Sequence, residues 1–369
     1  MRNPQWMIYG ATGYTGRLIA QEAVRRGHRP ILAARSALKL APLAEQLGLE
    51  HLVLDLSSNR VLAKAVTPYQ AVLNAAGPYS STGRLILDTC LLTQTHYLDI
   101  NGEIPFLEYV LSQDQAARRK AITLLPGAGF DVVPTDCMAG YVTSQLTDPC
   151  YLDIAISGGS QASAGTRRSS LEILANGGQV RRSGRLMSFP LGFDGRNVRF
   201  ADRSRPVIPV PWGDLSTAYY STAVPNITTF MAFSPGSIRL LRGVGRAIPA
   251  ILRWTRLRRW LQSRQGPSGK GPDPVSNQDH RSQIYVRAIN GSGQIAQAWL
   301  ETLDGYRFTA FSAVSCLETV LQKQAAGAFT PVQLLGMDWV LSVEHTRRLD
   351  TLPEHPSHPL AMSQPGRSS

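Results

Sequence analysis

The sequence predicts an α/β fold: a doubly wound parallel sheet followed by a second, α+β domain built on a largely antiparallel sheet. Three observations predict it. A glycine-rich turn stands between a short apolar run and a helical segment at the start of the chain. Six strand-like runs then alternate with helical segments over roughly the first 130 residues, as in a parallel sheet with crossover helices. From about residue 150, strand-like runs recur without regular helices between them, which is typical of antiparallel sheets.

The glycine-rich turn follows the apolar run 6–9 and opens a helix. Gly10 permits a tight turn, Gly13 lets backbone approach a pyrophosphate, and Gly16 lets the helix lie close to the sheet. The helix N-terminus adds free N–H groups and the positive end of its dipole. We expect a dinucleotide-binding loop, of which Thr12, Tyr14 and Thr15 are also part. An ordinary glycine-rich strand–helix turn is the alternative.

The end of the second expected strand, 30–34, indicates which nucleotide is bound. An acidic side chain here suits the ribose 2′-hydroxyl of NAD, whereas an arginine suits the 2′-phosphate of NADP. Arg35 occupies this position with no Asp or Glu beside it, and Lys39 follows one helical turn later. NADP is therefore favoured over NAD, with a solvated surface arginine as the alternative.

The remaining strands of the first sheet place further candidates at the same edge, since ligands of doubly wound sheets bind outside the carboxyl ends of the strands. The run 51–54 ends at Asp55, which we expect near the adenine. The run 71–76 leads into backbone expected along the nicotinamide ribose, formed by Ala75, Ala76, Gly77 and Pro78. Tyr79 follows, and we expect it near the nicotinamide ring. The runs 96–100 and 121–125 complete the six, with a helix expected between them over 107–119.

Domain boundaries follow from the change in pattern. A dinucleotide-binding domain is expected at 1–135 and a substrate or dimerisation domain at 136–303. The second domain has expected strands at 151–157, 179–187, 198–201, 226–233, 282–290 and 294–303, and an inserted helix at 166–174. Such a sheet typically supplies the wall facing the substrate and the contacts of a homodimer. A disordered tail is expected at 346–369, which is rich in proline and poor in apolar residues.

The formal net charge of +12 is a local feature. No acidic residue occurs between Asp214 and Asp273, an interval with nine Lys and Arg residues. This localisation argues against a general nucleic-acid-binding surface. The stretch 237–264 is basic and amphipathic, with a kink expected at Pro249. It suits peripheral contact with a membrane or a lid over an apolar ligand, and a helix packed on its own domain is the alternative.

The sequence lacks the motifs of several other classes of protein. Four scattered cysteines predict reduced thiols rather than disulfides or a metal site. The glycine turn begins too early for a preceding signal peptide, and no apolar run is long enough to span a membrane, so a cytoplasmic protein is expected. There is no HExxH, no GxSxG and no tyrosine four residues before a lysine. Hydride transfer is the chemistry that remains.

Four blocks carry a resemblance to a known family: 10–16, 74–79 (NAAGPY), 95–103 (THYLDINGE) and 129–136 (GFDVVPTD). The chain resembles the saccharopine dehydrogenase-like oxidoreductases, which include the trans-acting enoyl reductases of lipid synthesis. The resemblance implies a Rossmann domain split by an inserted α+β domain, and NAD(P)-linked reduction. The segment 327–331 (GAFTP) resembles the family's closing segment, so 304–345 is expected to return to the Rossmann domain.

Within these blocks, the candidates for proton donation or substrate contact are Tyr79, Tyr97, Asp99, Glu103, Asp131 and Asp136. The two loop aspartates could instead brace their loops, and Asp136 or Thr135 could cap the following helix. We expect an NADP-dependent oxidoreductase that reduces a C=C, C=O or C=N bond of an apolar, lipid-linked small molecule. The alternatives are a non-catalytic NADP-binding sensor or membrane-associated adaptor, and an amino-acid dehydrogenase of the saccharopine type. The last would need convergent arginines, for which Arg167, Arg168, Arg181 and Arg182 are available.

Overall fold

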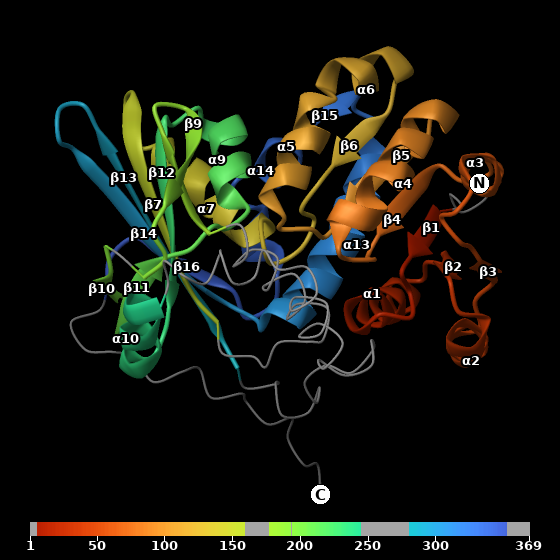
Figure 1. The fold of residues 1–369 in the computed structure, drawn as a ribbon, viewed down its shortest axis with the longest axis horizontal. Coiled ribbons are helices and arrows are strands. Elements are labelled where there is room, and N and C mark those ends of the chain that lie inside the picture. The colour runs from red at the N-terminus through yellow and green to blue at the C-terminus, as the bar shows by residue number, and fades with distance from the viewer. Residues whose placement is uncertain (1–5, 159–176, 193, 245–279, 353–369) are drawn as a thin grey trace, which may run out of the picture.

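The computed structural model describes residues 6–158, 177–192, 194–244 and 280–352. Two sheets stand beside each other, with helices packed on and between them (Figure 1). The first sheet is formed mainly by the N-terminal third of the chain. The second is formed by the middle of the chain together with one strand from near its C-terminal end.

The first sheet has seven parallel strands in the order β15-β6-β5-β4-β1-β2-β3. The six predicted strands are all present, and their order is that of a Rossmann fold. They are β1 (Trp6–Tyr9), β2 (Ile31–Ala34), β3 (His51–Val53), β4 (Ala71–Asn74), β5 (His96–Asp99) and β6 (Thr123–Leu125).

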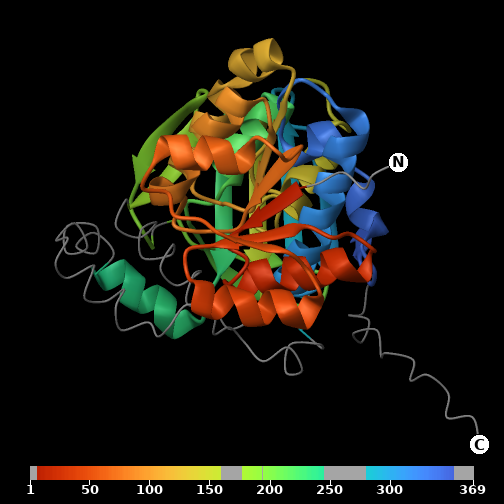
Figure 2. The ribbon, with the colours of Figure 1, turned by 90° about the vertical axis from the view of Figure 1, so that its right-hand side faces the viewer.

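Helices cover both faces of this sheet (Figure 2). They are α1 (Tyr14–Arg25), α2 (Ala37–Leu47), α3 (Asn59–Val66), α4 (Tyr79–Thr93), α5 (Ile104–Ser112), α6 (Asp114–Lys120) and α13 (Gly305–Lys323). The core alternates along each strand: Trp6 and Ile8 of β1 join one apolar cluster, and Met7 and Tyr9 join another. Because both faces are buried, the strands read as continuous apolar runs.

The second sheet is mixed, in the order β10-β11-β12-β7-β13-β14-β16, with β8 and β9 attached to β12. Only β12 and β7 pair in parallel among its described strands. The strands are β7 (Pro149–Ser157), β8 (Gly178–Arg182), β9 (Arg185–Phe189), β10 (Arg196–Arg199), β11 (Ser204–Pro209), β12 (Asn226–Ala232), β13 (Ser282–Asn290), β14 (Ile295–Thr302) and β16 (Arg347–Leu349). Helices α7 (Val133–Thr143) and α9 (Asp214–Thr222) pack on it, and α10 (Pro235–Val244) follows β12.

The structure differs from expectation in four elements. The predicted strand 179–187 is two strands, because Ser183 and Gly184 have positive φ and form a hairpin turn. β11 was not predicted. The predicted helix 107–119 is divided at Gln113 into α5 and α6. The tail predicted to be disordered at 346–369 is corrected in its first part, since β16 pairs with β14, and residues 353–369 lie outside the described residues.

The C-terminal part of the chain returns to the first sheet. Strand β15 (Gly327–Ala328) pairs with β6, and α13 packs along α1. The short helix α14 (Pro331–Leu335) and the 3₁₀ helix η1 (Trp339–Ser342) follow and contact α7.

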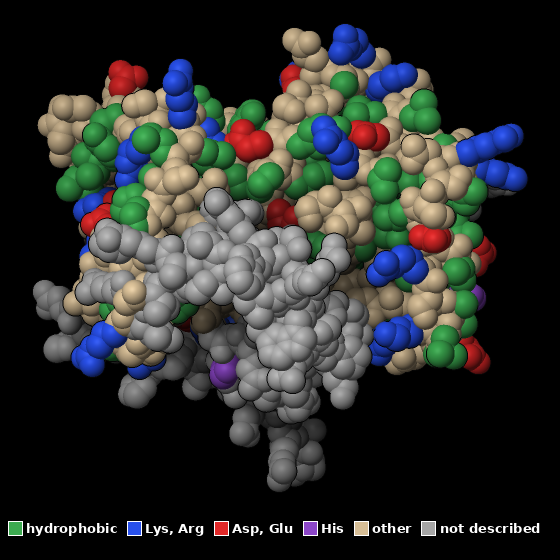
Figure 3. Space-filling view, in the orientation of Figure 1, with side chains coloured by type: hydrophobic (Ala, Val, Ile, Leu, Met, Phe, Trp, Pro, Cys, Tyr) green, Lys and Arg blue, Asp and Glu red, His purple; other side chains and the backbone are tan. Residues whose placement is uncertain are grey.

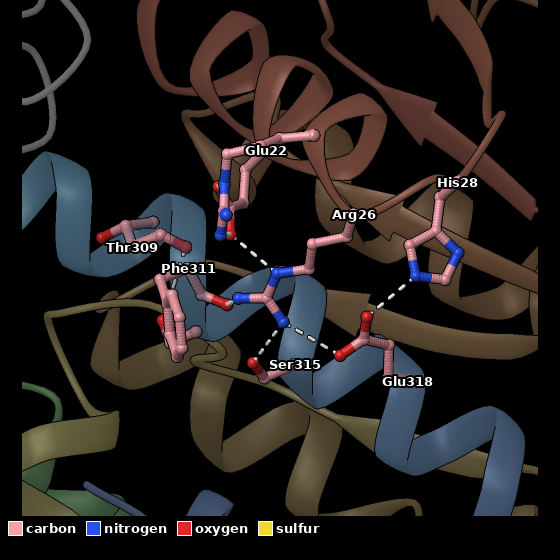
Figure 4. Close-up of polar contacts among 9 residues, drawn as sticks. Glu22, Arg26, His28, Thr309, Phe311, Ser315 and Glu318 are labelled. Atoms are coloured by element: carbon pink, nitrogen blue, oxygen red, sulfur yellow. Dashed lines mark hydrogen bonds and ion pairs between the residues drawn. The ribbon is translucent and has the colours of Figure 1, made fainter. Parts of the chain in front are cut away.

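Polar contacts fix α13 to α1, and we call this set the α1–α13 junction (Figure 4). The Arg26 guanidinium donates to Glu22, to Ser315 Oγ and to Glu318, at 2.7–2.9 Å. It also donates to the Phe311 carbonyl at 3.1 Å and lies 4.2 Å from the centre of the Phe311 ring. A second contact joins His28 Nε2 to Glu318 at 2.8 Å. The last helix is thereby held against the first.

The predicted helix 166–174 and most of the basic stretch 237–264 lie outside the described residues. On the face drawn in Figure 3, the Lys and Arg side chains of the described residues are scattered rather than gathered in one patch. No helix in the described ranges is long and apolar enough to cross a bilayer.

Candidate functional site

The glycine-rich loop has the geometry that its sequence predicts. Gly10 has φ +87°, and a Cβ on it would lie 2.8 Å from backbone atoms of Ala75 and Ala76. A Cβ on Gly16 would overlap the Gly10 carbonyl oxygen, while one on Gly13 would lie 3.2 Å from it. The loop therefore sits against the residues that follow β4, and α1 starts directly behind it. Such close backbone packing is typical of loops that bind a pyrophosphate at the N-terminus of the following helix, here α1.

The residues predicted to select the nucleotide lie at the adjoining strand ends. Arg35 directly follows β2, and its side chain is exposed, as are those of Lys39 and Asp55. The pKa of Tyr9, at the end of β1, is raised by burial, lowered by Arg35 and raised by Asp55. Both charged side chains are therefore close to the end of β1. An exposed arginine at this position suits a 2′-phosphate.

The segment 75–79 runs from the end of β4 into α4. Its first turn is fixed by Asn74, whose Oδ1 accepts from the Ala76 N–H at 3.0 Å. The Gly77–Pro78 peptide bond is cis. Tyr79 is the first residue of α4. This segment lies against Gly10, as expected for backbone along the cofactor.

Neither tyrosine candidate presents its hydroxyl to open space. Tyr79 is 6% exposed, and its hydroxyl donates to the Asn74 carbonyl at 3.1 Å. Tyr97 is fully buried and accepts from Asn74 Nδ2 at 3.4 Å. Burial raises the pKa of both hydroxyls well above the usual range. The geometry gives both residues structural contacts, and a catalytic role for either stays a prediction.

Glu103 and Asp99 also bond to the protein. The two carboxylate oxygens of Glu103 accept from the backbone N–H groups of Tyr79 and Ser80, at 2.9 and 3.0 Å. They thus compensate the N-terminus of α4. Asp99 Oδ1 accepts from the Asn101 backbone, the Asn101 side chain and the Gly127 N–H. Asp99 therefore braces the loops after β5 and β6, while burial raises its pKa.

Asp131 differs from these candidates. It lies in the loop between β6 and α7 and is half-buried. A Cβ on Gly102 would lie 3.1 Å from its Oδ2, so the carboxyl faces the loop after β5. Burial raises the pKa of Asp131 to about 6. A carboxyl that gains and loses a proton near neutral pH is suited to general acid catalysis.

Helix α13 holds the loop that carries Asp131. The Phe130 N–H donates to Thr309 Oγ1 at 3.0 Å, and Ser312 Oγ donates to the Ala128 carbonyl at 2.9 Å. Helix α13 also places Tyr306 edge to face against Tyr14 of the glycine-rich loop, with 4.9 Å between ring centres. These α13 residues were not predicted as site residues. No local pattern links them to a loop some 180 positions earlier.

Asp131, Asp136 and Asp214 together form what we call the acid cluster, at the starts of α7 and α9. Asp136 was a candidate for proton donation or substrate contact, with helix capping as the alternative. The capping alternative is wrong for both Thr135 and Asp136, since α7 begins earlier, with Val132 as its N-cap. The Asp136 carboxylate instead accepts from Ser221 Oγ at 2.7 Å and from the Val332 N–H at 2.9 Å. It therefore joins α7 to α9 and α14.

Asp214 was not among the predicted site residues. It is fully buried, and among the described residues only Thr135 and its own backbone N–H act as donors toward its carboxylate, neither in good hydrogen-bond geometry. Burial raises the pKa of Asp214 well above the usual range, and the charges of Asp136 and Asp131 raise it further.

A pocket of about 400 Å³ opens beside the cofactor edge, and we call it the aromatic pocket. Its lining comes from the starts of α4 and α5, the loop after β5, and two residues of the second domain: Tyr79, Ser80, Arg84, Gly102, Glu103, Ile104, Pro105, Phe106, Tyr109, Gln179 and Pro211. Tyr79, Gly102 and Glu103 therefore belong both to the strand ends where the cofactor is expected and to the pocket. The volume is in the range typical of small-molecule sites.

Comparison with known proteins identifies the first domain. Residues 6–125 match the family model of the saccharopine dehydrogenase NADP binding domain. This match confirms the predicted NADP-binding domain and the resemblance to the saccharopine dehydrogenase-like oxidoreductases.

Two named relatives agree with it. A trans-acting enoyl reductase of Mycobacterium ulcerans (strain Agy99) is 32% identical over 139 residues, which cover 35% of this chain and 33% of that protein. A saccharopine dehydrogenase-like oxidoreductase of Bos taurus is 26% identical over 162 residues, covering 38% and 37%. The matched region thus spans about a third of the length of these curated relatives.

A solved structure supports the fold of the whole chain. Saccharopine dehydrogenase (L-Glu forming) of Saccharomyces cerevisiae aligns with a TM-score of 0.62 at 12% identity, covering 94% of this chain and 100% of that one. At this identity the similarity concerns the fold.

Proposed function

We propose that the protein is an NADP-dependent oxidoreductase that reduces a C=C, C=O or C=N bond of a small apolar substrate. The observation that carries the proposal is the aromatic pocket, which shares Tyr79, Gly102 and Glu103 with the strand ends behind the glycine-rich loop. A substrate in this pocket would lie next to a nicotinamide at the predicted position. Bound NADPH would supply the hydride, as in other nicotinamide enzymes.

The residues of this chain would bind, orient and protonate. The loop 10–16 and Arg35 would hold the dinucleotide, and Tyr79 and Phe106 would pack against the apolar part of the substrate. Asp131 is the residue we propose as proton donor, because it is half-buried, faces Gly102 and has a pKa of about 6. Its proton would go to the substrate atom that has not received the hydride.

The saccharopine-type alternative is weakened by two arginines in the second domain. Arg181 is 4% exposed and donates to the Leu215 carbonyl, to the Gly184 carbonyl and to Glu108. Arg182 donates to the backbone carbonyls of Arg181 and Ile227 and to Thr228 Oγ1. With their donors used by protein acceptors, these two do not form a dicarboxylate site. Arg167 and Arg168 lie outside the described residues.

Nucleotide selection is tested by fluorescence titration with NADPH and NADH. We expect the wild type to prefer NADPH and Arg35→Ser to lose at least tenfold in NADPH affinity, while NADH affinity stays the same. Arg119→Ser, an exposed arginine on α6, is the matched control. Equal affinity of the wild type for both nucleotides would contradict the assignment of Arg35.

Catalysis is tested by NADPH oxidation with a medium-chain enoyl thioester, and by mass spectrometry of molecules retained through gentle purification. Turnover that Asp131→Asn reduces strongly, with NADPH affinity intact, is the expected result. NADPH binding without oxidation of enoyl, carbonyl or imine probes would favour the sensor. Retained lipid would support a lipid-linked substrate.

Liposome flotation of the full chain and of a variant lacking 237–264 tests the proposed membrane contact. Sedimentation tests the proposed homodimer.

A further inference from the structure

The walls of the aromatic pocket are apolar on one side. The rings of Tyr79 and Phe106 are stacked, 6.0 Å apart at an interplanar angle of 19°. Phe106 in turn lies 6.3 Å from Tyr109. Ile104, Pro105 and Pro211 add aliphatic surface to the lining. Such a wall favours an apolar substrate body, since its burial gains roughly 25 cal/mol for each Å² removed from water.

The acidic group of the pocket is already compensated. Both oxygens of Glu103 accept backbone N–H groups at the start of α4. At a helix N-terminus, a carboxylate is balanced by the positive end of the dipole. The start of α4 therefore offsets part of the negative potential with which Glu103 would repel an anionic ligand.

The basic group of the pocket is Arg84. Its guanidinium lies over the Tyr109 ring, 4.1 Å from the ring centre, and its side chain is exposed to the pocket and to solvent. The nearby Asp88 accepts the Tyr109 hydroxyl at 2.7 Å. Arg84 also has a hydrogen-bonding contact with Tyr109. A guanidinium has five N–H donors, so others are left to bind a carboxylate or phosphate.

Two residues of the second domain complete the lining of the aromatic pocket. Gln179 of β8 and Pro211 lie across the pocket from α4 and α5. The substrate would therefore contact both domains, with Arg84 on the Rossmann side.

We propose that the aromatic pocket takes an amphiphile with an apolar body and a single anionic head group, and that Arg84 binds this head group. The inference rests on the proposed function, because it concerns the same pocket. It makes Arg84 a specificity-determining residue that selects charged over neutral substrates. Carboxylate and phosphate share the chemistry that Arg84 recognises.

The test is calorimetric titration of the full chain, with and without NADP⁺, using decanoate, decyl phosphate and neutral 1-decanol as probes. We expect one or both anions to bind at least tenfold more tightly than decanol. Arg84→Gln should remove that preference, Arg84→Lys should retain part of it, and the control Arg119→Gln should keep it. The stronger of the two anions identifies the head group.

Two outcomes would overturn the inference: decanol binding as tightly as both anions, or an anion preference that survives in Arg84→Gln. NADPH affinity is measured on the same samples. NADPH binding without an anion preference overturns this inference alone, whereas a protein that binds decanoate through Arg84 but never binds NADPH overturns the proposed function alone.

Discussion

At the α1–α13 junction, the charged side chains meet partners of opposite charge or neutral acceptors, whereas the acid cluster brings three carboxyl groups together. Arg26 satisfies two glutamates, a serine and a backbone carbonyl. In the acid cluster, Asp136 accepts two well-formed hydrogen bonds, whereas Asp214 has only poorly aligned contacts with Thr135 and its own backbone N–H among the described residues.

The paired charges of the junction stabilise the fold, whereas buried carboxylates that lack good partners destabilise it. A paired and bonded charge is costly to remove, while an unpaired buried carboxyl raises its pKa and becomes neutral. Carboxyls with raised pKa values beside a cleft are typical of functional sites. The comparison therefore assigns the junction to stability, and it leaves Asp131, which is only half-buried, as the member of the acid cluster that we propose for the chemistry.

The largest expected effect is at the junction. Arg26→Met should lower the free energy of unfolding by about 3 kcal/mol, because it removes a partly buried ion pair from both Glu22 and Glu318 together with the bonds to Ser315 and Phe311. Glu22 keeps Arg25 and Glu318 keeps His28. Urea denaturation measures it. Arg25→Met is the matched control, since Arg25 also pairs with Glu22 but its side chain is 66% exposed, and it should cost less than about 1 kcal/mol. Equal losses would show that burial of Arg26 does not matter.

Asp131→Asn should act in the opposite direction. The pKa of Asp131 is raised to about 6 in the folded protein, so its contribution to stability is present in acid and is lost as pH rises through that value. The amide carries no charge, and we expect the variant to be more stable than wild type by about 2 kcal/mol at pH 8 and equal to it at pH 4. Urea unfolding at both pH values measures this difference. A variant less stable than wild type at pH 8 would refute a destabilising charge here.

Thr309→Val tests whether α13 positions the Asp131 loop. The valine keeps the shape of the side chain but leaves the Phe130 N–H without its acceptor, at a cost of about 1.5 kcal/mol. If Asp131 is the proton donor, kcat should fall while NADPH affinity is unchanged. The conservative variant Thr309→Ser should restore both stability and kcat. A loss of NADPH affinity in Thr309→Val would place the effect on the cofactor instead.

The smallest effect is expected for His28→Ala. The imidazole contacts Glu318 at 2.8 Å and meets the Trp6 ring edge to face at 6.1 Å. Losing both should cost about 1 kcal/mol. A double-mutant cycle with Arg26→Met measures how far the two contacts on Glu318 are coupled. Strict additivity would mean that they act independently.

The fold was largely predictable because its signals are local. The strand–turn–helix around Gly10 and the alternating runs after it specify a parallel sheet by periodicity alone. β11 was not predicted, because it contains Arg205 and two prolines and lacks the alternating pattern of a strand. β16 was not predicted either, because its three residues form a strand only through pairing with β14.

The candidate site was only partly predictable for a related reason. The sequence indicates which loops converge at the carboxyl edge, and these contain Asp131. It does not show that Glu103 bonds to the start of α4 or that Asp136 bonds to α14, since both contacts depend on packing between distant segments. Arg84 carried no motif, and only its position over Tyr109 distinguishes it from other exposed arginines.

The return of α13 and β15 to the first sheet has a consequence for biosynthesis. When the ribosome has made residue 135, the growing chain holds six strands, but the helix that covers α1 and the seventh strand do not yet exist. Helix α1, whose buried residues share an apolar cluster with Phe308, Ala313 and Val314 of α13, then lacks one of its final packing partners. The nucleotide-binding unit therefore reaches its complete core only after the inserted domain has been translated. A chain shortened to end at 303 should emerge with exposed apolar surface and a tendency to bind chaperones.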